Sequence, residues 1–379
     1  DVRLPHTCKE LPYHYFDEHA YQMLCGYRRH FMAPEAWQGK SVELTFEGVA
    51  HDAVVYVNGT EVKAHHCGYT AFFVEIAKYL KYGEDNVLAV RVDSRENLNI
   101  PPFGYAIDYM TFGGMYREVY VQVRNKTHLA DVFVKPQIHP LQVTTEITVQ
   151  NISDGITLQQ EIRKKGEGAY SPLGQKPVKQ TNVQTVFPVQ EIRLWEPENP
   201  YLYEIRTSLW KNGEMIDARV DITGFREAGF RKDGFYLNGK KLRLRGLNRH
   251  QSYPYVGYAA PASMQIFDAD ILKKELGVNA VRTSHYPQSQ DFIRRCDEIG
   301  LLVFTEFPGW QHIGDEEWKR QAVQNLKEMI VQYRNHPSII LWGVRINESQ
   351  DDDVFYRETN RVAHELDDTR ATGGVRMLK

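Results

Sequence analysis

The sequence has few cysteines, no long apolar run and almost no excess charge. Only four of its 379 residues are cysteines, and none has C-x-x-C spacing, which argues against a structural zinc site or a disulfide framework. No run of 18 apolar residues is present, so we expect no transmembrane helix and no membrane partner. A net charge of −3 gives no reason to expect a nucleic-acid partner. What remains is an ordinary globular composition, long enough for two or three domains.

The first third of the chain has the pattern of β-strands. Residues 41–49 alternate apolar and polar side chains, the period of a half-buried strand. The pair Asn58-Gly59 lies between apolar runs and favours a tight hairpin turn. Residues 100–114 are rich in Pro, Gly and aromatic side chains, which is typical of a shaped loop. Short strands with turn signals at this spacing predict a sandwich or a jelly roll over residues 1–124.

A second β-rich block follows over residues 125–230. Its candidate strands include residues 144–150 and 201–210, and Asn212-Gly213 predicts another hairpin turn. Residues 166–177 are rich in Gly, Pro and Lys and are expected to form a loop. About seven short strands in about a hundred residues predict an immunoglobulin-like sandwich.

From residue 231 onward, amphipathic helices alternate with apolar strands. Each repeat is a helix, a glycine or proline stop, and a buried strand, which predicts parallel βα units. Helices are expected at residues 263–276, 289–299, 315–334 and 353–366, and strands at 241–247, 278–283, 301–305 and 338–344. We therefore predict that residues 231–379 hold about the first five units of a (β/α)8 barrel.

Polar, ionisable side chains follow four successive predicted strands. They are His250, His285, Glu306 and the pair Asn347-Glu348. In βα barrels the loops after the strands carry function, so this pattern predicts a catalytic face, with capping of the barrel rim as the alternative. Glu348 follows an apolar strand, and we expect a partly desolvated position that would raise its pKa and suit it to donate a proton. Taken alone, an Asn-Glu pair is better explained by a solvated loop.

Seven stretches form an ordered set along nearly the whole chain. They are GMYREV at 114–119, WEPENPYLY at 195–203, GFR at 224–226, GLNRH at 246–250, NAVRTSHYP at 279–287, NHPSIILW at 335–342 and NE at 347–348. In this order they resemble glycoside hydrolase family 2, the family of bacterial β-galactosidase and β-glucuronidase. The β-galactosidase branch is the more similar one.

The resemblance implies a jelly roll, an immunoglobulin-like sandwich and a βα barrel that together hydrolyse a terminal β-linked sugar with retention of configuration. Such chemistry needs two carboxyl groups about 5–5.5 Å apart, one as acid/base and one as nucleophile. By match to the family's motifs, Glu348 is expected to be the acid/base and Asn347 to hydrogen-bond the sugar's 2-hydroxyl. His250 and His285 would line the sugar pocket.

Two further residues gain a role from the same resemblance. Asp108 falls where β-galactosidases have an Asp that reaches sugar hydroxyls from the first domain. Trp310 could offer an aromatic face to the sugar, although a rim or core Trp explains it equally well. Both are therefore expected substrate-binding residues.

The chain departs from the family pattern at two places. The loop at residues 307–314 lacks the Glu that often helps to hold magnesium in β-galactosidases, and His312 alone cannot support a site. We predict no metal ligands and no cofactor, with magnesium kept only as an alternative. The family's nucleophile is a Glu at the end of the seventh barrel strand, and no residue up to Lys379 matches it.

These observations favour part of a retaining exo-β-galactosidase, with a carbohydrate as partner. The alternatives are a β-glucuronidase of the same family, an inactive or carbohydrate-binding fragment, and a barrel completed by a second polypeptide. The residues that separate galactose from glucuronate are expected beyond residue 379. A homo-oligomer, and a location in a bacterial cytoplasm or periplasm, are left open.

Overall fold

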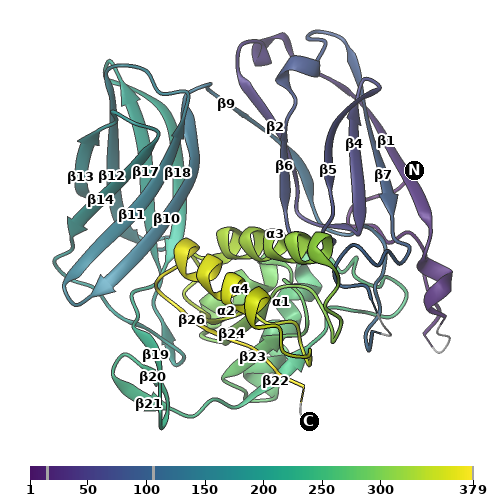
Figure 1. The fold of residues 1–379 in the computed structure, drawn as a ribbon. Helices are drawn as coiled ribbons and strands as arrows, with labels where there is room; N and C mark the ends of the chain where they lie inside the picture. The colour runs from purple at the N-terminus through teal and green to yellow at the C-terminus, as the bar shows by residue number, and fades with distance from the viewer. Residues whose placement is uncertain (14–16, 105–106, 378–379) are drawn as a thin grey trace.

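The computed structural model describes residues 1–13, 17–104 and 107–377. Two β-sandwiches stand side by side above an α/β body, with α3 (Glu316–Tyr333) lying beneath the space between them (Figure 1). Within the described residues, no helix has both the length and the apolar character needed to cross a bilayer.

The first sandwich packs a sheet ordered β1-β7-β4-β5 against a sheet ordered β6-β2-β9. Its core is a single cluster of apolar side chains that reaches from Ala33 to Met115. The predicted hairpin is confirmed, since Asn58 and Gly59 join β4 to β5 with φ of 51° and 82°. The strands are β1 (Leu24–Met32), β2 (Ser41–Phe46), β3 (Val49–Ala50), β4 (Asp52–Val57), β5 (Thr60–His65), β6 (Phe72–Glu75), β7 (Asp85–Asp93), β8 (Gly114–Met115) and β9 (Val119–Arg124).

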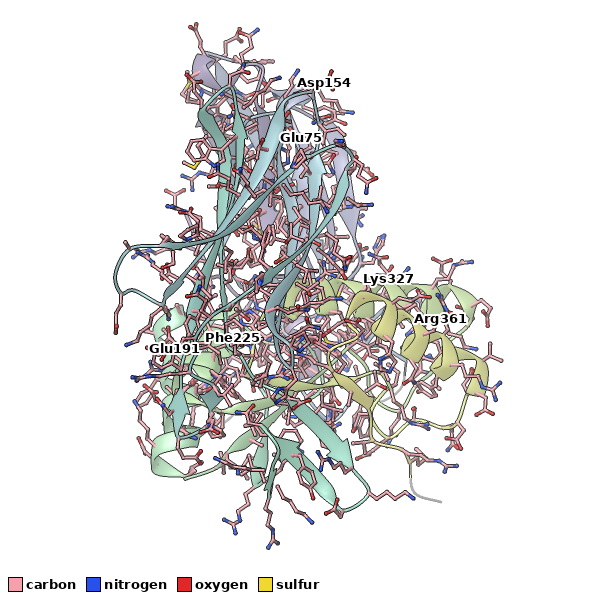
Figure 2. All side chains as sticks on the ribbon, turned by 90° about the vertical axis from the view of Figure 1, so that its left-hand side faces the viewer. Glu75, Asp154, Glu191, Phe225, Lys327 and Arg361 are labelled. Atoms are coloured by element: carbon pink, nitrogen blue, oxygen red, sulfur yellow. The ribbon has the colours of Figure 1, made fainter. Side chains whose placement is uncertain are left out.

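The second sandwich packs a sheet ordered β10-β11-β14 against one ordered β13-β12-β17-β18. Asn212 and Gly213 form the predicted turn between β17 and β18. Figure 2 places Phe225 low in this sandwich, near the α/β body, where its side chain is fully buried. The strands are β10 (His128–Ile138), β11 (Leu141–Gln150), β12 (Ile156–Lys164), β13 (Ser171–Pro177), β14 (Asn182–Pro188), β15 (Trp195–Glu196), β16 (Asn199–Pro200), β17 (Tyr203–Lys211) and β18 (Glu214–Thr223).

The prediction of a loop over residues 166–177 was wrong for its second half. Residues Ser171–Pro177 form β13, which pairs with β12 only and is an edge strand of its sheet. An edge strand tolerates Pro and Gly because half of its backbone groups need no ladder partner.

The α/β body holds five parallel strands in the order β22-β23-β24-β25-β26, as expected for an incomplete barrel. Helices cover this sheet, and their apolar faces make the largest core of the molecule. The strands are β22 (Gly246–Arg249), β23 (Ala280–Thr283), β24 (Leu302–Glu306), β25 (Ile339–Gly343) and β26 (Ala371–Gly373). The helices are α1 (Ala262–Asp270) with a π-turn (Ile271–Glu275), α2 (Gln290–Ile299), α3 and α4 (Asp353–Leu366).

Helix boundaries follow the capping residues. Ser289 and Asp315 accept hydrogen bonds from the first turns of α2 and α3, and Gly300 ends α2 with φ of 71°. The prediction of one strand over residues 241–247 was wrong. Lys240–Leu242 form β21 of a small antiparallel sheet with β19 (Ala228–Arg231) and β20 (Gly234–Leu237), and the barrel strand begins only at Gly246.

Aromatic packing and one cation join the first sandwich to the barrel. The Tyr69 ring stacks on the Tyr286 ring at a centroid distance of 4.4 Å. The buried Arg117 donates both to the Tyr69 carbonyl of its own sandwich and to the Pro287 carbonyl of the barrel, at 3.0 Å each. The loops of the first sandwich are therefore fixed against the barrel's first two βα loops.

Candidate active site

A buried carboxylate, Glu306, organises the face where the barrel strands end. It is 1% exposed at the end of β24. The Arg282 guanidinium of β23 donates to both of its oxygens, at 2.9 and 2.8 Å, and Nδ1–H of His285 donates to it at 2.6 Å. Residues from two neighbouring strands, β23 and β24, thus meet in one charged network.

The same guanidinium holds the predicted sugar-contact residue. Arg282 Nη2 also donates to Asn347 Oδ1 at 2.7 Å, and Asn347 is 2% exposed. The backbone of Asn347 pairs with the loop after β24, where Gln311 N–H donates to the Asn347 carbonyl at 2.8 Å. Arg282 thus holds the side-chain amide of Asn347 and Gln311 holds its backbone, and Nδ2 is the side-chain atom left to donate.

His250 lies beside this network within a group of rings. Its Nδ1 is 3.3 Å from the Tyr286 hydroxyl, and its ring centroid is 5.6 Å from that of His285 and 5.3 Å from that of Tyr109. Burial lowers the pKa of His250, the charge of His285 adds to this, and the Asp108 carboxylate opposes it. A neutral imidazole can donate and accept at once, which suits contact with sugar hydroxyls.

Glu348 differs from the sequence-based expectation. Its side chain is exposed in the structure of residues 1–379. The prediction of a partly desolvated position for Glu348 was therefore wrong in this structure. The backbone explains this orientation, because Glu348 has φ of 52° and its N–H donates to the Val375 carbonyl at 2.9 Å. Its carboxylate accepts a long hydrogen bond of 3.4 Å from Gln311 Nε2. The residue sits at the predicted strand end but faces solvent.

Asp108 and Trp310 lie at the border of the site. Asp108 is exposed, and its charge is one of the causes that raise the pKa of Tyr109, after burial and Tyr286. Trp310 is half-buried and pairs with Asn347 through its backbone. Within the described residues the buried indole N–H of Trp310 has no acceptor.

Among the described residues, no three His, Cys, Asp or Glu side chains converge as a metal site would require. His312 packs edge-on against Trp318, with ring centroids 5.6 Å apart. It also lies against Gly104 of the first sandwich, where an added Cβ would come within 1.9 Å of its ring. The geometry gives His312 a packing contact between domains.

Two residues of the site were missed from sequence. Arg282 is a charged residue inside a four-residue barrel strand, and that unusual position was a signal for it. Tyr109 lies in the Pro- and Gly-rich loop of the first sandwich and contacts rings from two barrel loops. Nothing local in the sequence distinguishes Tyr109 from the other aromatics of that loop.

Three family models match the chain in order. "Glycosyl hydrolases family 2, sugar binding domain" covers residues 12–124, "Glycosyl hydrolases family 2" covers 127–226, and "Glycosyl hydrolases family 2, TIM barrel domain" covers 229–375. A β-galactosidase of Thermoanaerobacter pseudethanolicus is 50% identical, over 100% of this chain and 52% of the relative. A β-galactosidase of Thermoanaerobacterium thermosulfurigenes is 47% identical, over 100% of this chain and 54% of the relative. The chain spans about half the length of these relatives.

The chain is also similar to solved structures that have the same architecture. Bacteroides uniformis β-glucuronidase 2, covalently bound to cyclophellitol-6-carboxylate aziridine, has a TM-score of 0.85 and 29% identity, over 98% of this chain and 48% of that one. A glycosyl hydrolase family 2 member from Bacteroides cellulosilyticus has a TM-score of 0.87 and 26% identity, over 100% of this chain and 52% of that one.

Proposed function

Because the chain belongs to glycosyl hydrolase family 2, we propose that it forms part of a retaining exo-β-glycosidase that removes terminal β-linked galactose. The preference for galactose rests on the two β-galactosidases that are 50% and 47% identical to it. We also propose domain limits at residues 124/125 and 230/231, since one apolar core lies within residues 33–115 and another within 129–225.

One observation carries the catalytic assignment: the exposed Glu348 follows a buried, doubly anchored Asn347 at the end of the barrel sheet. In the proposed reaction Glu348 protonates the leaving oxygen and later takes a proton from the attacking water. Asn347 donates from Nδ2 to the sugar's 2-hydroxyl, because Arg282 already occupies its Oδ1.

The proposed sugar pocket continues over the neighbouring strand ends. His250, His285, Asp108 and Trp310 supply polar groups and one aromatic side chain around the same position. Glu306 is excluded as the nucleophile, since it is buried and both of its oxygens accept from Arg282. We propose that the second carboxylate comes from outside residues 1–379, as the resemblance implies.

The test is to express the complete reading frame and to assay aryl β-galactoside beside aryl β-glucuronide. We expect hydrolysis of the galactoside and its loss in Glu348→Gln. Glu365→Gln, on the exposed surface of α4, is the matched control and should retain full activity. Preference for the glucuronide would assign the alternative substrate of the same family. Normal sugar release by residues 1–379 alone would refute the proposed position of the second carboxylate.

A further inference from the structure

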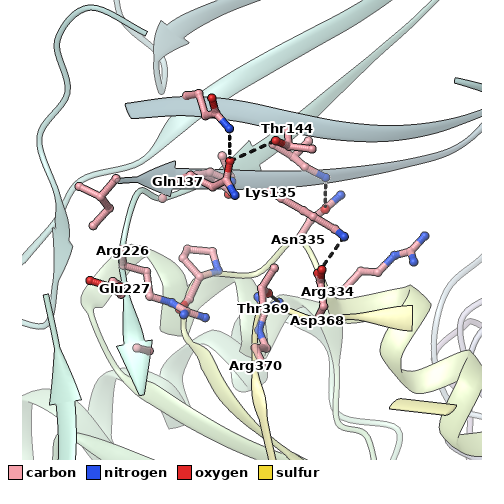
Figure 3. A pocket seen from close by; sticks show the side chains of 18 of the residues that line it. Lys135, Gln137, Thr144, Arg226, Glu227, Arg334, Asn335, Asp368, Thr369 and Arg370 are labelled. Carbon is pink, nitrogen blue, oxygen red and sulfur yellow. Dashed lines mark hydrogen bonds and ion pairs between the residues drawn. The ribbon is translucent and has the colours of Figure 1, made fainter. Parts of the chain in front are cut away.

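A cleft of about 630 Å³ lies between the second sandwich and the barrel. One wall of the cleft is formed by residues of β10 and β11. The other is formed by the segments that directly precede β25 and β26 (Figure 3). At about 30 Å³ per water the cleft could hold on the order of twenty waters, so a hydrated ligand fits. It lies where β25 and β26 begin, whereas the candidate active site lies where the barrel strands end.

Arg226 enters this cleft as a cation without a counter-ion. Its Nε donates to the Pro337 carbonyl at 2.8 Å and its Nη2 to the Ile339 carbonyl at 2.6 Å. Throughout the described part of the chain, no carboxylate lies within ion-pair distance of it, including that of the adjacent Glu227. Within the described residues its hydrogen-bond acceptors are two backbone carbonyls, and the Asp367 and Asp297 carboxylates act on it from beyond ion-pair distance.

A second guanidinium meets Arg226 at the same acceptor. Arg370 Nε also donates to the Ile339 carbonyl, at 2.8 Å. Burial, together with the neighbouring Arg370, lowers the pKa of Arg226 to about 9. Arg226 is still a cation at neutral pH, and the Asp367 and Asp297 carboxylates oppose the repulsion between the two guanidinium groups.

The other cations of the cleft are already paired. Lys135 bridges Glu146 at 2.6 Å and Asp368 at 2.8 Å, and Arg370 pairs with Asp367 at 2.7 Å. Arg334 pairs with Asp131. Arg226 is thus the one cation on the wall for which the described residues provide no carboxylate.

We propose that this cleft binds a small oxyanion, such as inorganic phosphate or a dicarboxylate, with Arg226 as its cationic contact. The Nε–H and one Nη2–H of Arg226 already bind carbonyls, so Nη1 and the second Nη2–H are the donors that remain for two oxygens of such a group. Amide and hydroxyl side chains complete the wall, among them Gln137, Thr144, Gln184, Asn335 and Thr369. No Phe, Tyr or Trp lines the cleft in the described residues, so a sugar would find no ring to stack on.

The test is calorimetric titration of the complete protein with phosphate and, separately, malonate, at constant ionic strength against sodium chloride. We expect saturable binding of one oxyanion per chain, and the tighter of the two identifies the ligand as phosphate-like or carboxylate-like. Arg226→Gln should weaken binding at least tenfold. Arg357→Gln, a matched change on the exposed surface of α4, should leave it unchanged.

A second variant keeps the proposal falsifiable if Arg226→Gln does not fold. Gln137 Oε1 accepts hydrogen bonds from Gln142 and Thr144, so Gln137→Glu keeps both bonds and adds only a negative charge to the cleft. It should weaken binding several-fold, whereas Gln175→Glu on β13 should not. Heats equal to those of chloride, or unchanged affinity in a folded Arg226→Gln or in Gln137→Glu, would overturn the proposal.

Discussion

Arg282 of β23 donates to Asn347 Oδ1 at 2.7 Å while both oxygens of Glu306 accept from the same guanidinium. One side chain thereby sets the orientation of an amide that follows a strand two places away in the sheet. The orientation matters because an amide presents a donor on one side and an acceptor on the other. The proposed contact with the sugar's 2-hydroxyl therefore depends on a residue that need not touch the sugar.

Replacing Arg282 tests this dependence. Arg282→Lys removes the forked donor and leaves the buried Glu306 with fewer hydrogen bonds. Breaking a buried ion pair lowers the free energy of unfolding by about 3 kcal/mol. In the complete protein we expect kcat to fall about 100-fold with a smaller change in KM, since misplacement of a catalytic contact has effects of this size. Steady-state kinetics and urea unfolding measure the two effects. Arg357→Lys, on the exposed face of α4, should change neither.

Leaving-group dependence tests the role of Glu348. Loss of a general acid costs on the order of 100- to 10,000-fold when the leaving group needs a proton. Glu348→Gln should therefore lose far more activity on an alkyl β-galactoside than on a nitrophenyl one, whose phenol leaves without protonation. Equal losses on both substrates would contradict the assignment of Glu348 as the acid.

The buried His51 should make stability depend on pH. Burial lowers its pKa from 6.5 to about 4, and Nε2–H donates to the Thr111 carbonyl. The unfolded chain binds the proton more readily, so stability contributed by neutral His51 is present above pH 6.5 and is lost as the pH falls toward 4. The full loss is on the order of 3 kcal/mol. Urea unfolding at pH 7 and 4.5 should show a smaller pH effect in His51→Gln than in the unaltered chain.

Gly104→Ala tests the contact between the first sandwich and the loop after β24. A Cβ at residue 104 would overlap the His312 ring, so one of the two loops must move. We expect a loss of about 1–3 kcal/mol in unfolding free energy, as for overpacked sites. Gly26→Ala, where no atom lies within 4 Å of the new Cβ, should change stability by less than about 0.5 kcal/mol. Similar effects of the two changes would contradict this packing.

Local sequence signals predicted the helices, strands and turns, but they did not predict contacts between residues far apart in the chain. Asn58-Gly59, Ser289 and Gly300 act through the conformation of their own backbone or through a hydrogen bond to a neighbouring turn, so the sequence reveals them. By contrast, His65 is buried and its Nε2 lies 3.0 Å from a carboxylate oxygen of Glu328, 263 positions later. No periodicity encodes such a pairing.

The candidate site also has features that the sequence predicted and features that it did not. Strand ends predicted which residues would gather, because parallel strands end at one edge. The exposure of Glu348 depended on its left-handed backbone and on a hydrogen bond to the Val375 carbonyl, which the strand pattern did not contain. The position of Arg282 inside a short barrel strand marks it as unusual, but its partners Glu306 and Asn347 come from later parts of the chain, and the strand pattern does not reveal them.

The Tyr69–Tyr286 stack and the Arg117 bridge also bear on the order of folding. A ribosome makes the first sandwich before the barrel loops, and domains generally fold as units in that order. The Tyr69 ring and the Arg117 guanidinium are then already in place when residues 286 and 287 emerge. In that order of synthesis, the sandwich would offer the second βα loop a surface to pack against before the sheet is complete.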